Sequence, residues 1–503
     1  MSVSRRRFIE LLGLGAGAAA LMPVIGRANP VFDGFHAALP GKPWLAGWED
    51  VAGDSLARQT LVVEGRMPAG LSGTLFRNGP ARFERAGFRY HHWFDGDGLV
   101  HAWRVGNGRV THEARFVATD KYVREDKADK FLVMAAGTTI PNAVAIRGPD
   151  DFNTANTAVI EHGGKLYALW EGGSAWELDP ATLESLGAKT WRDDLAHLPF
   201  SAHPQPDVDG SLWNFGAMGY LSEPKLALWR IAADGTLASF DLIDMPNSGY
   251  VHAFSISAKH LVVVIAPLMS GVGGEGAFFE RQRWTPEAGS IALVIDKADR
   301  TKVQRFELPA GLAYHWGAAI ERGSRIELVA CWYDEGGETN VELAAMMRGQ
   351  PGMGAGIGAR LKRITLDRAT GRGSVSDTGV ADVEFPTFDP RVDAPRYTWF
   401  AHQHGPNQTN QFDAVARWDA KRERLATFRY GEGRIAEEHR FVPRPGASGE
   451  LDGWLVGTAL DWKAKQTVLS VFDAARFEDG PIAQARLPRT VPLGFHGWFS
   501  PTA

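Results

Sequence analysis

The sequence predicts an all-β fold of many short strands, which favours a β-propeller. Three observations predict it. The 503 residues include 57 glycines, 17 tryptophans and 27 phenylalanines, a composition typical of tight turns between short strands. Apolar or alternating runs of strand length recur along the chain with Asp-Gly turns between them. No flexible or charged linker interrupts the chain after residue 28, so one large unit is expected.

The clearest elements follow from local patterning. Strands are expected at Lys165–Trp170, Leu261–Leu268, Ser290–Asp296, Arg325–Tyr333, Trp454–Trp462 and Thr467–Phe472. Turns are expected at Asp95–Gly98, Asp209-Gly210, Asp234-Gly235 and Asp452-Gly453, loops at Gly271–Gly276 and Gly352–Gly358, and one helix near Asn340–Arg348. At roughly 68 residues per blade, seven blades would fill the chain after residue 28. A pair of β-sandwiches competes, because no WD or kelch signature repeats.

Composition excludes several classes of protein. Charged residues make up 22% and hydrophobic residues 44%, which argues against disorder, collagen and coiled coil. The net charge is −5 and no long basic run occurs, so a nucleic-acid partner is not expected. The single cysteine, Cys331, cannot form a disulfide within the chain.

The N-terminus resembles an export signal. Ser4–Ile9 matches the twin-arginine pattern S-R-R-x-F-[IL], and the apolar stretch Leu11–Ile25 is too short and too rich in Gly and Ala for a membrane span. Gly26-Arg27-Ala28 offers a cleavage site. Residues 1–28 are therefore expected to be a signal peptide, residues 29–503 a single propeller domain, and the mature protein periplasmic. A tail anchor or an amphipathic start is the alternative. Because this route carries folded cargo, a cofactor loaded in the cytoplasm is expected.

Four of the fifteen histidines stand in aromatic and glycine-rich contexts: His203, His252, His315 and His496. Burial there is costly unless each imidazole has a partner. The pairs His402/His404 and His91/His92 are weaker candidates for metal binding. No G-x-S-x-G elbow, P-loop or dinucleotide fingerprint is present.

These segments together resemble the carotenoid cleavage oxygenase family, in order and over nearly all of the chain after residue 28. The matching motifs are G-T-L-F-R-N-G-P at 73–80, W-F-D-G-D-G-L-V-H at 93–101, N-T-A-N-T at 153–157, L-W-E-G-G at 169–173, F-V-P-R-P-G at 441–446 and G-F-H-G-W-F at 494–499. Two positions depart from the family pattern: Ala253 replaces an Asp after the second histidine, and Ala318 replaces an Asn after the third.

The resemblance implies a seven-bladed propeller whose long loops form a cap over the metal-bearing face. It implies one Fe(II) per chain, with His203, His252, His315 and His496 as ligands and catalytic centre. Three carboxylates, Glu171, Glu384 and Glu438, would hold His252, His315 and His496, although Glu437 adjoins the third. Four neutral imidazoles leave positions on the metal open for dioxygen.

The activity implied is cleavage of an alkene C=C by O2 to give two carbonyl products. An apolar carotenoid or apocarotenoid is the expected substrate; a stilbene-type phenol is the alternative, for which Lys121 is a candidate anchor, although a solvated lysine is the simpler interpretation. Ala344–Ile357 is a candidate for peripheral membrane contact, and no obligate protein partner is evident. A metal-free propeller that only binds an apolar ligand is the hypothesis from another class.

Overall fold

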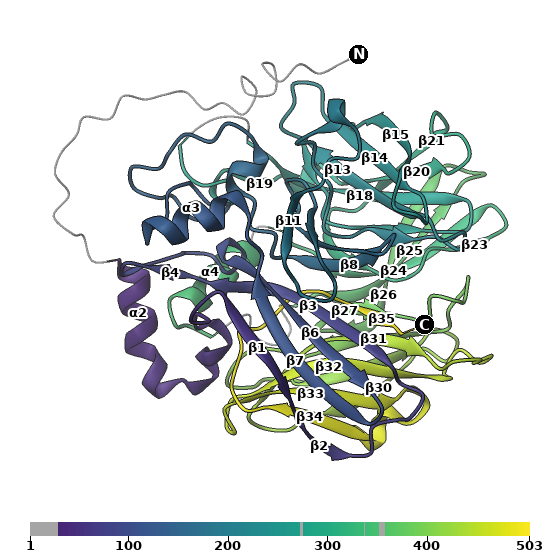
Figure 1. Ribbon diagram of the computed structural model, residues 1–503. Coiled ribbons are helices and arrows are strands. Elements are labelled where there is room, and N and C mark those ends of the chain that lie inside the picture. Colours follow the sequence, from purple (N-terminus) through teal and green to yellow (C-terminus); the bar gives the residue numbers. More distant parts are fainter. Residues whose placement is uncertain (1–28, 272–274, 337, 352–357, 503) are drawn as a thin grey trace.

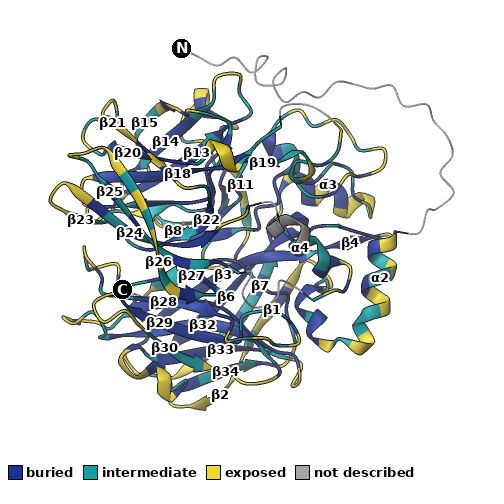
Figure 2. Ribbon diagram, turned by 180° about the vertical axis from the view of Figure 1, so that it is seen from behind, coloured by how far each residue is buried: buried dark blue, intermediate teal, exposed yellow. Residues whose placement is uncertain are grey.

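The computed structural model describes residues 29–502 except 272–274, 337 and 352–357. Among the described residues, seven of its sheets are arranged as the blades of a propeller, and an eighth is a two-stranded hairpin outside the blades (Figure 1). Buried residues concentrate in the strands, while exposed residues lie mainly in the outer loops (Figure 2). The predicted all-β, seven-bladed architecture is confirmed. The expected signal peptide, residues 1–28, lies outside the described residues.

The blades are numbered in the order in which the chain passes through them. Blade 1 joins β1 (Ser55–Thr60), β7 (Arg109–Phe116), β6 (Asp97–Gly106), β3 (Gly73–Arg82) and β35 (Gly497–Pro501); blade 2 joins β8 (Ala158–His162), β9 (Lys165–Leu169), β10 (Trp176–Leu178) and β11 (Ser185–Ala188). Blade 3 joins β12 (Gln205–Pro206), β13 (Leu212–Met218), β14 (Lys225–Ile231) and β15 (Leu237–Asp244). Blade 4 holds β16 (Gly249–Tyr250), β17 (Phe254–Ile256), β18 (His260–Met269), β19 (Arg283–Trp284), β20 (Ser290–Asp296) and β21 (Val303–Leu308).

The remaining blades complete the ring. Blade 5 holds β22 (Leu312–Trp316), β23 (Ile320–Arg322), β24 (Arg325–Tyr333), β25 (Arg360–Asp367) and β26 (Arg372–Ala381); blade 6 holds β27 (Val383–Thr387), β28 (Tyr397–His402), β29 (Ala414–Asp419) and β30 (Arg424–Arg429). Blade 7 holds β31 (Arg434–Pro443), β32 (Gly453–Asp461), β33 (Gln466–Asp473), β34 (Ala483–Leu487) and β2 (Val62–Gly65). β2 pairs with β34, and β35 pairs with β3, so both ends of the chain close the ring.

Within the described residues, three helices and several 3-10 turns lie outside the blades. The helices are α2 (Pro30–Ala38), α3 (Asp120–Ala128) and α4 (Glu338–Met347), which both views place together at one side of the propeller, beside the β4–β5 hairpin (Glu84–Arg85, Phe88–Arg89). The 3-10 turns are η1 (Leu39–Gly41), η2 (Pro43–Trp48), η3 (Trp93–Asp95), η4 (Pro149–Phe152), η5 (Asp193–Leu195), η6 (Phe279–Arg281), η7 (Pro286–Ala288) and η8 (Ala474–Asp479). No helix in the described ranges is long and apolar enough to cross a membrane.

An apolar cluster attaches the N-terminal segment and α4 to the propeller. Phe35 of α2 and Trp48 of η2 pack with Met346 and Met347 of α4 and with Leu460 of blade 7. Met346 and Met347 are almost fully buried. These two methionines of the expected membrane-contact segment 344–357 therefore face protein, and residues 352–357 of it lie outside the described residues.

The Asp95–Gly98 segment is not a hairpin turn, contrary to the turn prediction. Asp95 ends η3, and Asp97 begins β6. Both carboxylates are buried: Asp95 accepts hydrogen bonds from the Thr138 hydroxyl and the Gly137 amide, and Asp97 accepts one from Lys121. In contrast, Gly210 and Gly235 lie in turns between strands with φ of 79° and 85°, a conformation that favours glycine.

Candidate metal centre

The four candidate histidines come from four different blades. His203 precedes β12 of blade 3, His252 lies between β16 and β17 of blade 4, His315 lies in β22 of blade 5, and His496 precedes β35 of blade 1. Their candidate ligand atoms all lie within 4.8 Å of one another. The closed ring of blades therefore brings together residues that are up to 293 positions apart in the sequence.

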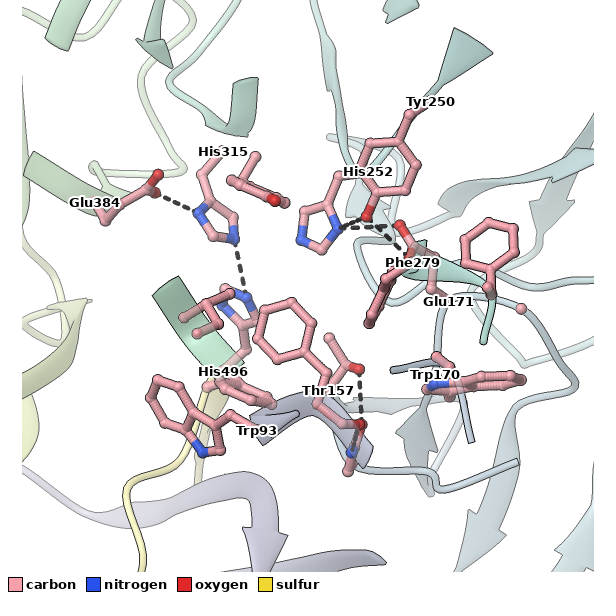
Figure 3. A pocket seen from close by; sticks show the side chains of 18 of the residues that line it. Trp93, Thr157, Trp170, Glu171, Tyr250, His252, Phe279, His315, Glu384 and His496 are labelled. Atoms are coloured by element: carbon pink, nitrogen blue, oxygen red, sulfur yellow. Dashed lines mark hydrogen bonds and ion pairs between the residues drawn. The ribbon is translucent and has the colours of Figure 1, made fainter. Parts of the chain in front are cut away.

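Three carboxylates come from the other three blades. Glu171 follows β9 in blade 2, Glu384 lies in β27 of blade 6, and Glu438 lies in β31 of blade 7. The Nδ1–carboxylate distances are 3.0 Å for His252–Glu171, 2.5 Å for His315–Glu384 and 3.1 Å for His496–Glu438. Figure 3 shows the first two pairs on opposite sides of the cluster. Each of the seven blades thus contributes a histidine or a carboxylate to the centre.

The carboxylates fix which ring nitrogen faces inward. A carboxylate accepts the Nδ1–H of its histidine, so Nε2 presents a lone pair to the axis. The Nε2 atoms of His203 and His252 are 2.9 Å apart, and those of His315 and His496 are 3.0 Å apart. Between His315 and His496, whose Nδ1 positions are both held by carboxylates, two such lone pairs repel unless a cation lies between them. Two nitrogens bound at about 2.0–2.1 Å to one ion, at right angles, would be about 2.9 Å apart. The donor set therefore fits a divalent metal.

Burial keeps two of these rings neutral. It lowers the pKa of His496 to about 4, although Glu438 opposes the shift, and lowers the pKa of His203 well below its usual value. Burial alone would raise the pKa of Glu438, but His496, Arg440 and Arg77 outweigh it and the pKa lies near 2. Neutral imidazoles are what metal coordination requires.

The structure separates Glu437 from Glu438. Glu438 accepts from His496 Nδ1, from Gly497 N at 2.6 Å and from Arg77 at 3.1 Å. Glu437 instead accepts from Arg77 at 3.1 Å and from Gly494 N at 2.7 Å. A register shift in β31 between Ala436 and His439 lets both adjacent carboxylates point to the same side of the strand.

Tyr250 belongs to this network and was not predicted from the sequence. Its hydroxyl donates to Glu171 Oε2 at 3.0 Å and lies 3.0 Å from His252 Nδ1 (Figure 3). It stands two residues before His252, and residues two apart in extended backbone point to the same side. This two-residue spacing is the feature of the sequence that could have indicated a contact between Tyr250 and the surroundings of His252. Tyr250 therefore holds the carboxylate that holds the histidine.

The two departures from the family pattern leave the cluster intact. Ala253 is buried in an apolar cluster with Trp316 of the next blade. Glu321, three residues after Ala318, accepts from Ser257, the Lys259 amide and His260 Nδ1, so it secures the turn before β18 rather than a candidate ligand.

The weaker histidine pairs do not form a comparable site. His91 stacks on Phe88, and His92 packs against Phe94 and Phe279. The rings of His402 and His404 are 5.8 Å apart, centroid to centroid. Within the described residues, the four-histidine group is the only set of three or more His, Cys, Asp or Glu positioned to hold a metal.

Lys121 is neither solvated nor a substrate anchor, which corrects both interpretations. Its side chain is fully buried in α3, where Nζ donates to Asp97 at 2.6 Å and to Glu125 at 2.9 Å. It is absent from the cavity lining described next.

A cavity of about 390 Å³ adjoins the histidines. His252, His315 and His496 form part of its wall, and most of the remainder is apolar or aromatic, including Trp93, Phe94, Phe152, Trp170, Phe279, Phe385 and Phe495. Figure 3 shows Trp93, Trp170 and Phe279 around the space beside the histidines. The cavity therefore suits an elongated apolar ligand that reaches the cluster.

Comparisons with known proteins agree with this geometry. The family model described as retinal pigment epithelial membrane protein matches residues 52–501. The apocarotenoid-15,15'-oxygenase of Synechocystis is 28% identical over 88% of this chain and 92% of its own length. The isoeugenol monooxygenase of Pseudomonas nitroreducens is 26% identical over 88% of this chain and 94% of its own length. The solved structure of the cobalt-substituted Synechocystis oxygenase superposes with a TM-score of 0.84 at 26% identity and covers 92% of this chain and 99% of that one.

Proposed function

We propose that this chain, which belongs to the family of the retinal pigment epithelial membrane protein and the carotenoid cleavage oxygenases, is an Fe(II)-dependent dioxygenase. Its proposed substrates are apocarotenoids or carotenoids. The reaction is alkene plus O2 to two carbonyl products, so both oxygen atoms are consumed and no reductant is needed. His203, His252, His315 and His496 would hold the iron. Bound iron would supply the redox chemistry with dioxygen.

One observation carries the proposal: an aromatic cavity opens directly onto the histidine cluster. The walls would hold a polyene so that one double bond lies beside the cluster, and they exclude water from it. Glu171, Glu384 and Glu438 fix the orientation of three rings. The cleavage itself requires no general acid or base from the chain.

A phenylpropanoid is the second candidate substrate, because the isoeugenol monooxygenase matches this chain over a similar length. A phenol needs a polar anchor, and Lys121, the anchor considered from the sequence, lies outside the lining. A metal-free binding propeller is less favoured, because it would leave the Nε2 lone pairs of His315 and His496 facing one another at 3.0 Å.

The test is a substrate panel with iron-loaded protein under air. Apocarotenals, carotenes, hydroxystilbenes and isoeugenol are incubated separately, and carbonyl products are identified by mass spectrometry. Equimolar pairs of carbonyl products from an apocarotenal are expected. Cleavage of the phenylpropanoids alone would overturn the substrate assignment, and iron-loaded protein that cleaves nothing would overturn the enzymatic one.

A further inference from the structure

One cation, Arg281, lines the cavity among the described residues. It ends η6, the 3-10 turn between β18 and β19. Its Nε is buried and has no hydrogen-bond partner in the described structure, and the guanidinium forms no ion pair with a described carboxylate. A buried donor without an acceptor is unfavourable unless a ligand supplies one.

The carboxylates of the lining are all engaged elsewhere. Glu171 accepts from His252 and Tyr250, Glu384 pairs with His315, and Glu437 accepts from Arg77. Asp382 accepts from the amide of Gly358. None of these acids therefore pairs with Arg281, so its guanidinium is available to an oxygen-bearing ligand in the cavity.

The backbone around Arg281 is held on two sides. Phe279 N donates to Ala136 O at 2.9 Å, and Arg281 N donates to Phe278 O at 3.2 Å. On the other side, a Cβ added at Gly271 would lie 2.8 Å from the carbonyl oxygen of Arg281, so the two segments are in close contact. Phe278 and Phe279 also line the cavity. The backbone that carries this cation is thus fixed at an aromatic section of the wall.

We propose that Arg281 binds the oxygen-bearing end of an otherwise apolar substrate, and that a carboxylate is its best ligand. The inference rests on the proposed function and narrows it from polyenes in general to polyenes with a terminal acid or carbonyl. A guanidinium can bind a carboxylate with two parallel hydrogen bonds, whereas an aldehyde or alcohol oxygen offers a weaker contact. A hydrocarbon carotenoid would leave the buried Nε of Arg281 without an acceptor.

Binding is measured on the iron-loaded protein without oxygen, by quenching of tryptophan fluorescence. The probes are β-apo-8'-carotenoic acid and the aldehyde and alcohol of the same polyene, which differ only at the terminus. The wild type should bind the acid most tightly. Arg281→Met should weaken binding of the acid by about 10- to 100-fold, the usual range for hydrogen bonds to a charged group, and binding of the alcohol by less than about 3-fold.

Arg283→Met is the matched control. Arg283 lies two residues further along in β19, is exposed and is not part of the cavity lining. It should leave binding of all three probes unchanged. Arg281→Lys, which keeps the charge but loses the planar fork, should give intermediate affinity for the acid and serves if the methionine variant does not fold.

Turnover gives a second readout. Arg281→Met should raise KM for the acid and leave kcat near the wild-type value, because Arg281 contacts the substrate end and not the reacting bond. Unchanged affinity for the acid, or equal losses for acid and alcohol, would overturn the role of Arg281. If the wild type binds the acid through Arg281 and cleaves no polyene, the proposed function fails and the binding role of Arg281 stands.

Discussion

At the residue scale, the hydrogen bond at Nδ1 of a histidine determines whether its Nε2 can present a lone pair to a metal. Glu171, Glu384 and Glu438 each take one Nδ1 position, which directs the Nε2 lone pair to the axis. His203 has no such carboxylate among the described residues, and its ring is oriented within the cluster by contacts to the other three. The centre therefore depends on a small number of hydrogen bonds outside the ligand set.

Glu171→Gln tests one of these hydrogen bonds. The amide keeps the size of the side chain and can still accept from His252, but it removes the charge that raises the basicity of the ring. Metal affinity or activity should fall roughly 10- to 100-fold. Both are measured, by metal titration and by initial rates.

Glu223→Gln is the control, because the Glu223 side chain is 85% exposed and its nearest cation is 3.8 Å away. It should change neither quantity, since exposed charges contribute little. Equal iron affinity and rate in both variants would mean that Glu171 does not support the centre.

The sequence predicts most residues of the candidate site, because they lie in motifs of known order. The four histidines converge as the resemblance implies. The sequence alone does not show that Glu438 rather than Glu437 contacts His496, because that depends on the register shift in β31. Arg281 lies in none of these motifs. Its importance comes from its position in the cavity wall and from the absence, among the described residues, of a hydrogen-bond partner for its Nε. Both arise only after folding.

At the element scale, α3 is attached to blade 1 by buried charges as well as by Tyr122, which stacks on Phe116 of β7. Lys121 of α3 lies between Asp97 of β6 and Glu125 one turn further along the helix. Arg85 also lies 3.5 Å from Asp97. The position of α3 relative to the blade therefore depends on this network being complete.

Lys121→Met should destabilise the protein by about 3–5 kcal/mol, because it leaves two buried carboxylates without their shared cation. Lys127→Met, in the last turn of the same helix and exposed, should change the stability little. Denaturant unfolding of the two variants measures the difference. Similar midpoints for both would show that the buried network does not stabilise α3.

The strands were more predictable than the helices. Ser290–Asp296 and Arg325–Tyr333 match β20 and β24 at both ends, since each combines β-branched or aromatic residues with clear boundaries. The helix predicted near Asn340–Arg348 matches α4 approximately. α3 was missed because two of its three buried residues, Lys121 and Glu125, are charged, so apolar periodicity is absent.

At the scale of the whole molecule, closure of the ring and assembly of the centre depend on the same strands. β2 near the N-terminus completes blade 7, and β35 near the C-terminus completes blade 1 and follows directly on His496. Every blade contributes a histidine or a carboxylate, so a metal held by the four histidines would be linked to four blades directly and through the carboxylate–histidine pairs to the others. A metal that binds only the folded chain would also stabilise it.

We also propose that residues 1–28 direct export by the twin-arginine route and are removed. Replacing Arg5 and Arg6 by Lys should retain the protein in the cytoplasm, because the receptor reads the arginine pair itself. Cell fractionation followed by N-terminal sequencing tests this. Periplasmic protein that still begins at Met1 would contradict removal of residues 1–28. Finding the variant with Lys at positions 5 and 6 in the periplasm would contradict export by the twin-arginine route.

The iron content of wild-type protein and His203→Ala, purified in parallel and analysed by mass spectrometry, tests the central claim most directly. His404→Ala is the matched control, since His404 is exposed and belongs to the alternative His402/His404 pair. About one iron per chain is expected in the wild type and in His404→Ala, with most of it lost in His203→Ala. A full complement of iron in His203→Ala, or loss of iron in His404→Ala alone, would contradict a metal centre built by the four histidines at the axis.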